Sequence, residues 1–267
     1  MNVKETYLDL DTYRTRILEC GDGPPTLCIH GVHFTNGADL WRQPMRAGLA
    51  QGRRIIAVDN LGWGPSQRPQ WDVQFSFFTD HIRQIQDALG LKRTNVIGHS
   101  FGGWIASLLA YESPERVGKL VLSDSGGMSP MAPDNVSRFE PPTEDGLRRY
   151  LAGIYSDSRD AEEQYGYHWR NATTAGAVDY YRRMGKTLQD PVSRRHYHLE
   201  RRLSGIQAPT LVIFGAQAPM PFSAEVGRQM AEAIPGSRFV SVEGAGHLTP
   251  YQKTHEYVRE VAAFLAE

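Results

Sequence analysis

The sequence predicts an α/β protein with a mostly parallel sheet flanked by helices, and three observations support this fold class. Short runs of β-branched and leucine residues recur along the chain, and they are apolar on both faces, which is typical of central strands covered by helices. Segments of helical periodicity separate these runs, as in repeated βαβ units. A Gly-x-Ser-x-Gly sequence, Gly98 to Gly102, lies between one such run and a helical segment.

The predicted elements follow one another in a regular order. Residues 6–19 alternate in polarity and predict two strands joined near Asp11, and the Gly- and Pro-rich residues 21–25 predict a turn. Four apolar residues within 78–89 are spaced by four, three and four, which predicts one face of a helix ending at Gly90. Further strands are predicted at 26–29, 55–58, 95–97, 120–122, 210–214 and 239–242, and further helices at 104–111 and 251–265.

Composition excludes several classes of protein. The formal net charge of −1 gives no electrostatic argument for binding nucleic acid or an anionic membrane. No basic start with an apolar stretch opens the chain, and no run is long enough to span a bilayer, so we expect a cytoplasmic protein. Cys20 and Cys28 are expected to be free thiols. No HExxH, paired CxxC or nucleotide-binding glycine loop is present, so neither a metal nor a cofactor is expected.

The Gly98-His99-Ser100-Phe101-Gly102 sequence has the order that a nucleophilic serine requires, a strand, a tight turn and a helix. The turn is so tight that a Cβ atom at either glycine would clash. It lifts the hydroxyl of Ser100 clear of the sheet and leaves the backbone N–H of Phe101 free to point at a substrate. We therefore predict Ser100 as the nucleophile.

This arrangement resembles the α/β-hydrolase superfamily, and the resemblance covers nearly the whole chain. Residues 59–66 are similar to the family's Asp-x-x-Gly-x-Gly-x-Ser loop, whose role is structural. No strand-like run occurs from 128 to 203, where the family often carries a helical cap. The resemblance therefore implies a core formed by 1–127 and 204–267 and a helical cap at 128–203, whose apolar and aromatic content argues against a disordered insertion.

A serine hydroxyl needs a base, because it is a weak nucleophile at neutral pH. His247 follows the last predicted strand, where the family's catalytic histidine lies. An oxyanion hole needs two N–H donors. Phe101 supplies one, and the similarity of His30-Gly31-Val32-His33 to the family's His-Gly-x motif implies Val32 as the second.

The acid departs from the commonest pattern of the family. Most relatives place an aspartate after the seventh strand in a Gly-x-x-Asp context, but Ala218 occupies that position here. Asp124 follows the sixth strand, and some branches place their acid there. We therefore predict Asp124 as the residue that orients His247, with a turn cap as the alternative role.

The predicted function is hydrolysis of a carboxylic ester or lactone through an acyl-enzyme, with a mid-sized apolar or aromatic substrate. The candidate substrate-binding residues are His30, which is also expected to support its loop, His33, Trp104, Tyr155 and Trp169. The cap also contains arginines that could hold a carboxylate, although such residues more often form solvated helix faces. They are Arg148, Arg149, Arg182, Arg183, Arg194, Arg195, Arg201 and Arg202.

Three alternatives remain open at this level. A cap arginine facing the cavity would favour a carbon–carbon bond hydrolase of ring-cleavage products, although that family's usual seventh-strand aspartate is absent. A cofactor-free dioxygenase of the same fold would use a His/Asp dyad, and a ligand receptor would bind without turnover. The expected partner is a small-molecule substrate, and a homodimer is possible.

Overall fold

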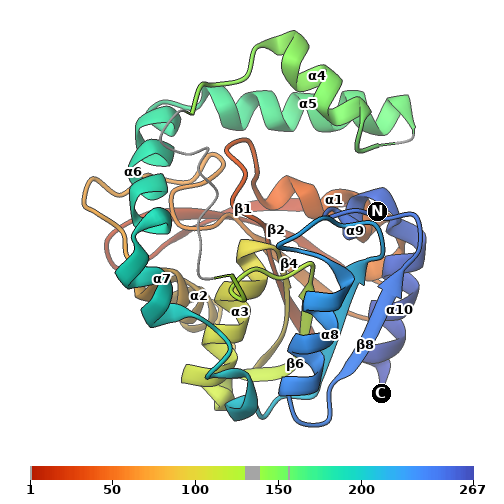
Figure 1. Ribbon diagram of the computed structural model, residues 1–267. Coiled ribbons are helices and arrows are strands. Elements are labelled where there is room, and N and C mark those ends of the chain that lie inside the picture. The colour runs from red at the N-terminus through yellow and green to blue at the C-terminus, as the bar shows by residue number, and fades with distance from the viewer. Residues whose placement is uncertain (1, 130–138, 156) are drawn as a thin grey trace.

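The computed structural model describes residues 2–129, 139–155 and 157–267, and its centre is one eight-stranded sheet (Figure 1). The strand order is β1-β2-β4-β3-β5-β6-β7-β8, with β1, β2 and β4 paired antiparallel and the remaining pairs parallel. The strands are β1 (Lys4–Asp9), β2 (Arg14–Cys20), β3 (Pro25–Ile29), β4 (Arg54–Val58), β5 (Thr94–His99), β6 (Val117–Ser123), β7 (Thr210–Gly215) and β8 (Arg238–Val242). The α/β fold class and all eight predicted strands are confirmed.

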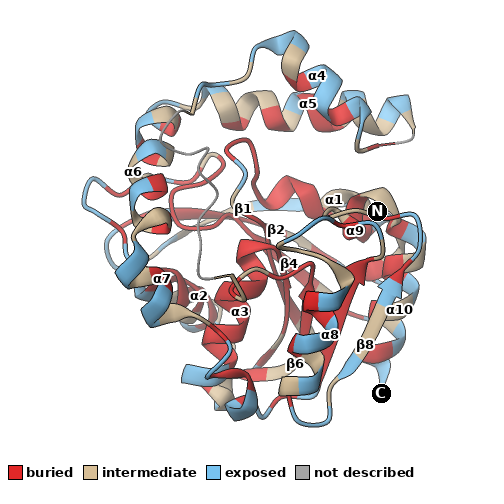
Figure 2. Cartoon of the chain, in the orientation of Figure 1, coloured by how far each residue is buried: buried red, intermediate tan, exposed pale blue. Residues whose placement is uncertain are grey.

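Helices cover both faces of the sheet, and buried residues concentrate between the layers (Figure 2). One face packs against α2 (Phe75–Ala88), α3 (Phe101–Glu112) and α8 (Ala224–Ala233). The other packs against the helical turns at 38–49, which include α1 (Arg42–Pro44), and against α10 (Thr254–Ala266). The helix predicted at 251–265 is divided into α9 (Thr249–Gln252) and α10, because Lys253 leaves the helical region with φ −131° and ψ 53°.

The described part of the segment between β6 and β7 contains four α-helices. Of these, α4 and α5 lie above the sheet in Figure 1. These helices are α4 (Glu144–Ala152), α5 (Ser158–Thr173), α6 (Ala177–Gln189) and α7 (Pro191–Tyr197). Short 3-10 turns at 114–116 and 203–205 precede β6 and β7. The described residues of the predicted cap, 128–203, therefore form helices and connecting turns.

Polar contacts attach α5 to the core. Arg170 donates to Asp39 at 2.8 Å, and Asn171 donates to the backbone carbonyl of Thr35 at 3.0 Å. Asp39 also accepts from the fully buried Arg16 at 2.7 Å. Because these partners are buried or half-buried, the contacts hold α5 over the loop that follows β3.

Candidate active site

Ser100 stands at a strained turn between β5 and α3. Its backbone has φ 56° and ψ −117°, a conformation that non-glycine residues rarely adopt. A Cβ atom on Gly98 would clash with the carbonyl of Gly102, and one on Gly102 would clash with the carbonyl of Ile29. The two flanking glycines therefore permit the turn that the motif predicts, and the turn presents the hydroxyl of Ser100 to a cavity.

His247 lies beside this hydroxyl. Its Nε2 atom is 3.0 Å from Oγ of Ser100, within hydrogen-bond distance. The ring of Phe222 stacks on the imidazole, with centroids 3.8 Å apart and planes inclined by 29°. His99 donates from Nε2 to the backbone carbonyl of His247 at 2.9 Å, which holds the loop from a second side. The structure thus brings together the predicted nucleophile and base.

Asp124 is held by the loop that carries His247 and makes no hydrogen bond to its imidazole. Its carboxylate accepts from the backbone N–H of Gly215 at 2.9 Å and from the N–H and hydroxyl of Thr249 at 3.0 Å each. Nδ1 of His247 is buried and has no hydrogen-bond partner among the described residues. The structure therefore does not show the contact expected between Asp124 and Nδ1, and the role of Asp124 as the acid stays a prediction.

Burial sets the protonation behaviour of both residues. It raises the pKa of Asp124 to about 7, although the three donors partly oppose this effect. It lowers the pKa of His247 to about 3, and the neighbouring His99 adds to the decrease. His247 is consequently a neutral imidazole at physiological pH, able to accept a proton from Ser100.

Two backbone N–H groups flank the nucleophile. Val32 follows β3 and Phe101 begins α3, and both residues line the same cavity as Ser100. Among the described residues, neither N–H donates to a backbone carbonyl or side chain. A Cβ atom built on Gly31, the residue before Val32, would lie 3.4 Å from Oγ of Ser100. The backbone of this loop therefore approaches the nucleophile closely. This arrangement suits the predicted oxyanion hole.

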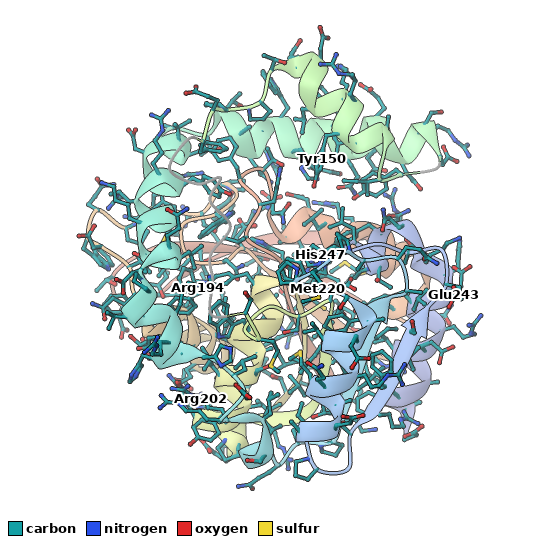
Figure 3. All side chains as sticks on the ribbon, in the orientation of Figure 1. Tyr150, Arg194, Arg202, Met220, Glu243 and His247 are labelled. Carbon is teal, nitrogen blue, oxygen red and sulfur yellow. The ribbon has the colours of Figure 1, made fainter. Side chains whose placement is uncertain are left out.

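The cavity has a volume of about 300 Å³, and its lining residues come both from the loops at the sheet and from the segment between β6 and β7. Of the predicted substrate-binding residues, His33, Trp104 and Tyr155 line it. Figure 3 shows Tyr150 on the underside of α4 above His247, and the ring of Tyr150 stacks on His33 with centroids 4.9 Å apart. The walls are largely aromatic and aliphatic, as expected for a mid-sized organic substrate.

His30 and Trp169 are not among the residues that line the cavity, which corrects two of the predicted assignments. Nε2 of His30 accepts from the N–H of Asn60 at 2.9 Å, and Nδ1 donates to the carbonyl of Gly31 at 2.7 Å. Both ring nitrogens of His30 therefore support the loop. Trp169 instead stacks on Tyr165 within α5, with centroids 6.1 Å apart.

Arg194 brings a positive charge to the cavity wall. It is the only one of the eight arginines predicted as carboxylate candidates that lines the cavity, and no carboxylate side chain does so among the described residues. Its guanidinium group donates to the carbonyls of Leu188 and Ser129 at 3.0 and 2.9 Å and lies 5.1 Å from the ring of Trp104. Figure 3 shows Arg194 on the α7 side of the site.

Several lining residues were not predicted from the sequence, among them Tyr150, His168, Phe222 and Tyr251. Phe222 follows a turn after β7, and Tyr251 lies in α9, four residues beyond His247. Proximity to His247 in the chain is the one signal that could have identified Tyr251, whereas the positions of the others depend on tertiary packing.

The described residues 2–129, 139–155 and 157–267 contain no cluster of three or more histidine, cysteine or carboxylate side chains suited to a metal ion. Within these same ranges, no helix has the length and apolar character required to cross a membrane. Cys20 and Cys28 are buried free thiols.

Comparisons with known proteins agree with this architecture. A family model described as alpha/beta hydrolase fold matches residues 24–254. A 2-hydroxymuconate semialdehyde hydrolase of Pseudomonas putida is 30% identical over 265 residues, covering 96% of this chain and 92% of the relative. A 2-hydroxy-6-oxononadienedioate/2-hydroxy-6-oxononatrienedioate hydrolase, also of Pseudomonas putida, is 28% identical, covering 98% and 94%.

Solved structures show the same fold. The 2-hydroxy-6-oxo-6-phenylhexa-2,4-dienoate hydrolase of Rhodococcus sp. strain RHA1 superposes with a TM-score of 0.84 at 18% identity, covering 100% of this chain and 99% of the other. The chain belongs to the alpha/beta hydrolase fold family.

Proposed function

We propose that this protein hydrolyses a carbon–carbon bond in an anionic ring-cleavage product, a 2-hydroxy-6-oxo-dienoate. The single observation that carries the proposal is the position of Arg194, the only charged side chain among the described residues lining the cavity of Ser100 and His247. A guanidinium group at an otherwise uncharged wall favours a substrate with a carboxylate. The names of the two Pseudomonas putida relatives support this substrate class.

The cavity suits a substrate with two different ends. The carboxylate of the dienoate would lie toward Arg194, and the 6-oxo carbon would lie at Ser100. The aromatic wall that includes Tyr150 and Tyr155 would contact the apolar group attached to that carbon. This orientation revises the prediction of an ester or lactone substrate, since the ester class requires no anionic end.

The first half of the reaction forms an acyl-enzyme. Nε2 of His247 takes the proton of Ser100, and Oγ attacks the 6-oxo carbon. The N–H groups of Val32 and Phe101 stabilise the oxyanion. When the tetrahedral species collapses, the carbon–carbon bond breaks and its electron pair moves to the leaving carbon. The substrate reacts as its 2-oxo tautomer, in which the proton of the 2-hydroxyl has moved to the carbon that will leave. The charge is delocalised from this carbon onto the 2-oxo oxygen, and that oxygen takes the proton held by His247.

The second half releases the acid. A water molecule loses a proton to His247 and attacks the acyl carbon, after which Ser100 regains a proton and the carboxylic acid departs. One water molecule is consumed, and the products are a carboxylic acid and a 2-hydroxydienoate. His247 serves as base and then as acid in each half, which requires the neutral form that its burial favours.

The test is the loss of dienoate absorbance on adding the protein to 2-hydroxy-6-oxo-6-phenylhexa-2,4-dienoate. We expect turnover by the parent protein and a loss on the order of 10⁴-fold or more in Ser100→Ala. Circular dichroism of the variant checks that the fold persists. Absence of dienoate turnover in the parent, with hydrolysis of neutral esters, would replace this proposal with the ester or lactone hydrolase.

A further inference from the structure

His99 links the turn of the nucleophile to the residue that supplies the base. It is the last residue of β5, directly before Ser100, and it is buried, with 1% of its surface exposed. Its Nε2 atom lies 2.9 Å from the backbone carbonyl of His247. Among the described residues, no other hydrogen bond reaches the backbone N–H or carbonyl of His247. The main chain of the base residue is therefore held at this point by His99.

This contact determines which nitrogen of His99 carries the proton. A backbone carbonyl can only accept, so Nε2 must be the donor. A carboxylate oxygen of Asp124 lies 3.8 Å from the same Nε2, which is beyond hydrogen-bond distance but favours a proton there. Burial lowers the pKa of His99 to about 4, so the ring is neutral at physiological pH and its Nδ1 is unprotonated.

The ring of His99 is packed on its other sides. The ring of Tyr251 stands at 77° to it, with centroids 5.3 Å apart. A Cβ atom built on Gly31 would lie 3.3 Å from Nδ1 of His99, so the loop that carries Val32 lies against this side. Close packing restricts rotation of the imidazole, and its donor therefore stays aimed at the carbonyl of His247.

The position of this carbonyl matters for the chemistry. Nε2 of His247 lies 3.0 Å from Oγ of Ser100, and proton transfer requires such a distance. The imidazole moves with its main chain, and a misplacement of about 1 Å can lower a rate roughly 100-fold. The hydrogen bonds of Asp124 act on Gly215 and Thr249, whereas that of His99 acts on His247 itself.

We propose that His99 is a positioning residue, whose Nε2–H holds the carbonyl of His247 so that the imidazole stays within reach of Ser100. The proposal rests on the proposed function only for the roles of Ser100 as nucleophile and His247 as base, and it requires no particular substrate. A His99 with a structural role alone would stabilise the fold without changing the reactivity of Ser100. The experiment separates these two roles.

The reactivity of Ser100 is measured as the second-order rate constant of its reaction with a fluorophosphonate. In this reaction Oγ bonds to phosphorus, fluoride leaves, and His247 takes the hydroxyl proton. His99→Phe keeps a buried ring without a donor, and we expect a rate constant roughly 10- to 100-fold below that of the parent protein. His99→Gln can place an amide N–H at the position of Nε2, so its rate constant should remain within about 3-fold of the parent value.

His81 provides a matched control, because it is also 1% exposed and its Nε2 lies 3.0 Å from a backbone carbonyl, that of Asp59. It does not line the cavity. His81→Phe should lower the midpoint of thermal unfolding, as His99→Phe does, because each variant leaves a buried carbonyl without its donor. The rate constant of His81→Phe with the fluorophosphonate should nevertheless stay within about 3-fold of the parent value.

A measurement on the parent protein covers the case in which His99→Phe does not fold. Long-range ¹⁵N–¹H correlation spectra of the ¹⁵N-histidine-labelled protein, assigned with His99→Gln, report which ring nitrogen carries the proton. We expect a proton on Nε2 of His99 and none on Nδ1 at neutral pH. A proton on Nδ1 alone would overturn the proposal, as would a large loss of serine reactivity in His99→Gln.

Three further results would overturn the proposal. They are a rate constant equal to that of the parent in a folded His99→Phe, an equal loss in His81→Phe, and no reaction of the parent protein with the fluorophosphonate. Failure of the proposed function is distinguishable, because it would appear as absent dienoate turnover in a parent protein whose Ser100 still reacts. The fluorophosphonate reaction does not depend on the dienoate.

Discussion

Asp124 accepts two hydrogen bonds from Thr249, which stands two residues beyond His247. Its third donor is the N–H of Gly215 at the end of β7. The carboxylate therefore joins three segments, the ends of β6 and β7 and the loop that carries His247. We therefore expect it to position the imidazole through the backbone, while the stacked Phe222 contacts the ring itself.

We predict that Asp124→Asn and Thr249→Val both lower kcat/KM, each by roughly 10- to 100-fold, because either change removes hydrogen bonds worth about 1–3 kcal/mol from the loop. Steady-state kinetics with the dienoate measure the effect, and thermal unfolding should show a parallel loss of stability. A loss on the order of 10⁴-fold in Asp124→Asn with a nearly unaffected Thr249→Val would instead show that the carboxylate acts on the imidazole.

The pH dependence of kcat/KM should lack an acidic limb near the ordinary histidine pKa of 6.5. Burial lowers the pKa of His247 to about 3, and no carboxylate among the described residues contacts Nδ1 to stabilise the imidazolium. We therefore expect kcat/KM to remain near its plateau from pH 8 to about 5.5, measured in assays shorter than any acid inactivation. A half-maximal value at pH 6–7 would contradict this.

The variant Ala218→Asp places a carboxylate in the turn after β7 and serves as the comparison for the pH profile of kcat/KM. Ala218 is buried in the turn after β7, where the preceding Gln217 donates to the carbonyl of Ala245 close to His247. In Ala218→Asp, a negative charge near Nδ1 would stabilise the imidazolium and move the acidic limb to higher pH. An unchanged pH profile in a folded and active Ala218→Asp protein would show that this position does not reach the imidazole.

The parts of the site that local geometry determines could be predicted from the sequence. The turn at Ser100 requires glycine on both sides, because a Cβ atom there would clash, and the five-residue motif alone shows this requirement. His247 could be identified because it follows the last strand, and parallel strands bring their carboxyl ends to one edge of the sheet. Six of the strands could be predicted from short apolar runs, and the first two from alternating polarity.

The parts that depend on side-chain placement across several elements could not be predicted. Asp124 was predicted to orient His247 directly, and the sequence could not show that Thr249 and Gly215 satisfy its carboxylate. His30 was assigned to substrate because nothing in the sequence shows that Asn60 occupies its ring. The sequence could not distinguish Arg194 from seven other candidate arginines, because its position at the cavity depends on the packing of α7.

Arg194→Gln should weaken binding of anionic substrates selectively. Loss of a charge-assisted hydrogen bond predicts an increase in KM for the dienoate of roughly 10-fold or more, with a much smaller change for a neutral 4-nitrophenyl ester. Arg194→Lys keeps the charge without the planar guanidinium group, so its KM for the dienoate should lie between those of the parent protein and Arg194→Gln. Equal losses on both substrates would mean that Arg194 acts through its bonds to Leu188 and Ser129 instead of through the substrate.

Acid should destabilise the protein strongly, because burial lowers the pKa of six histidines to about 3 or 4. They are His30, His33, His81, His99, His168 and His247. These groups bind protons in the unfolded state below their ordinary pKa of 6.5 but remain neutral when folded, so their stabilisation is present above pH 6.5 and lost as the pH falls toward 4. Asp124 acts in the opposite sense, since its raised pKa of about 7 lowers stability as the pH rises from about 4 to 7.

Six groups outweigh one, so the free energy of unfolding should fall on acidification from pH 6.5, with a slope on the order of several kcal/mol per pH unit. Urea unfolding followed by tryptophan fluorescence at closely spaced pH values gives this slope. In His81→Gln, which removes one buried titrating ring, the slope should decrease by about 1.4 kcal/mol per pH unit. A free energy of unfolding that stays constant between pH 6.5 and 5 would contradict the neutral state of the buried histidines, including that of His247 on which the proposed chemistry depends.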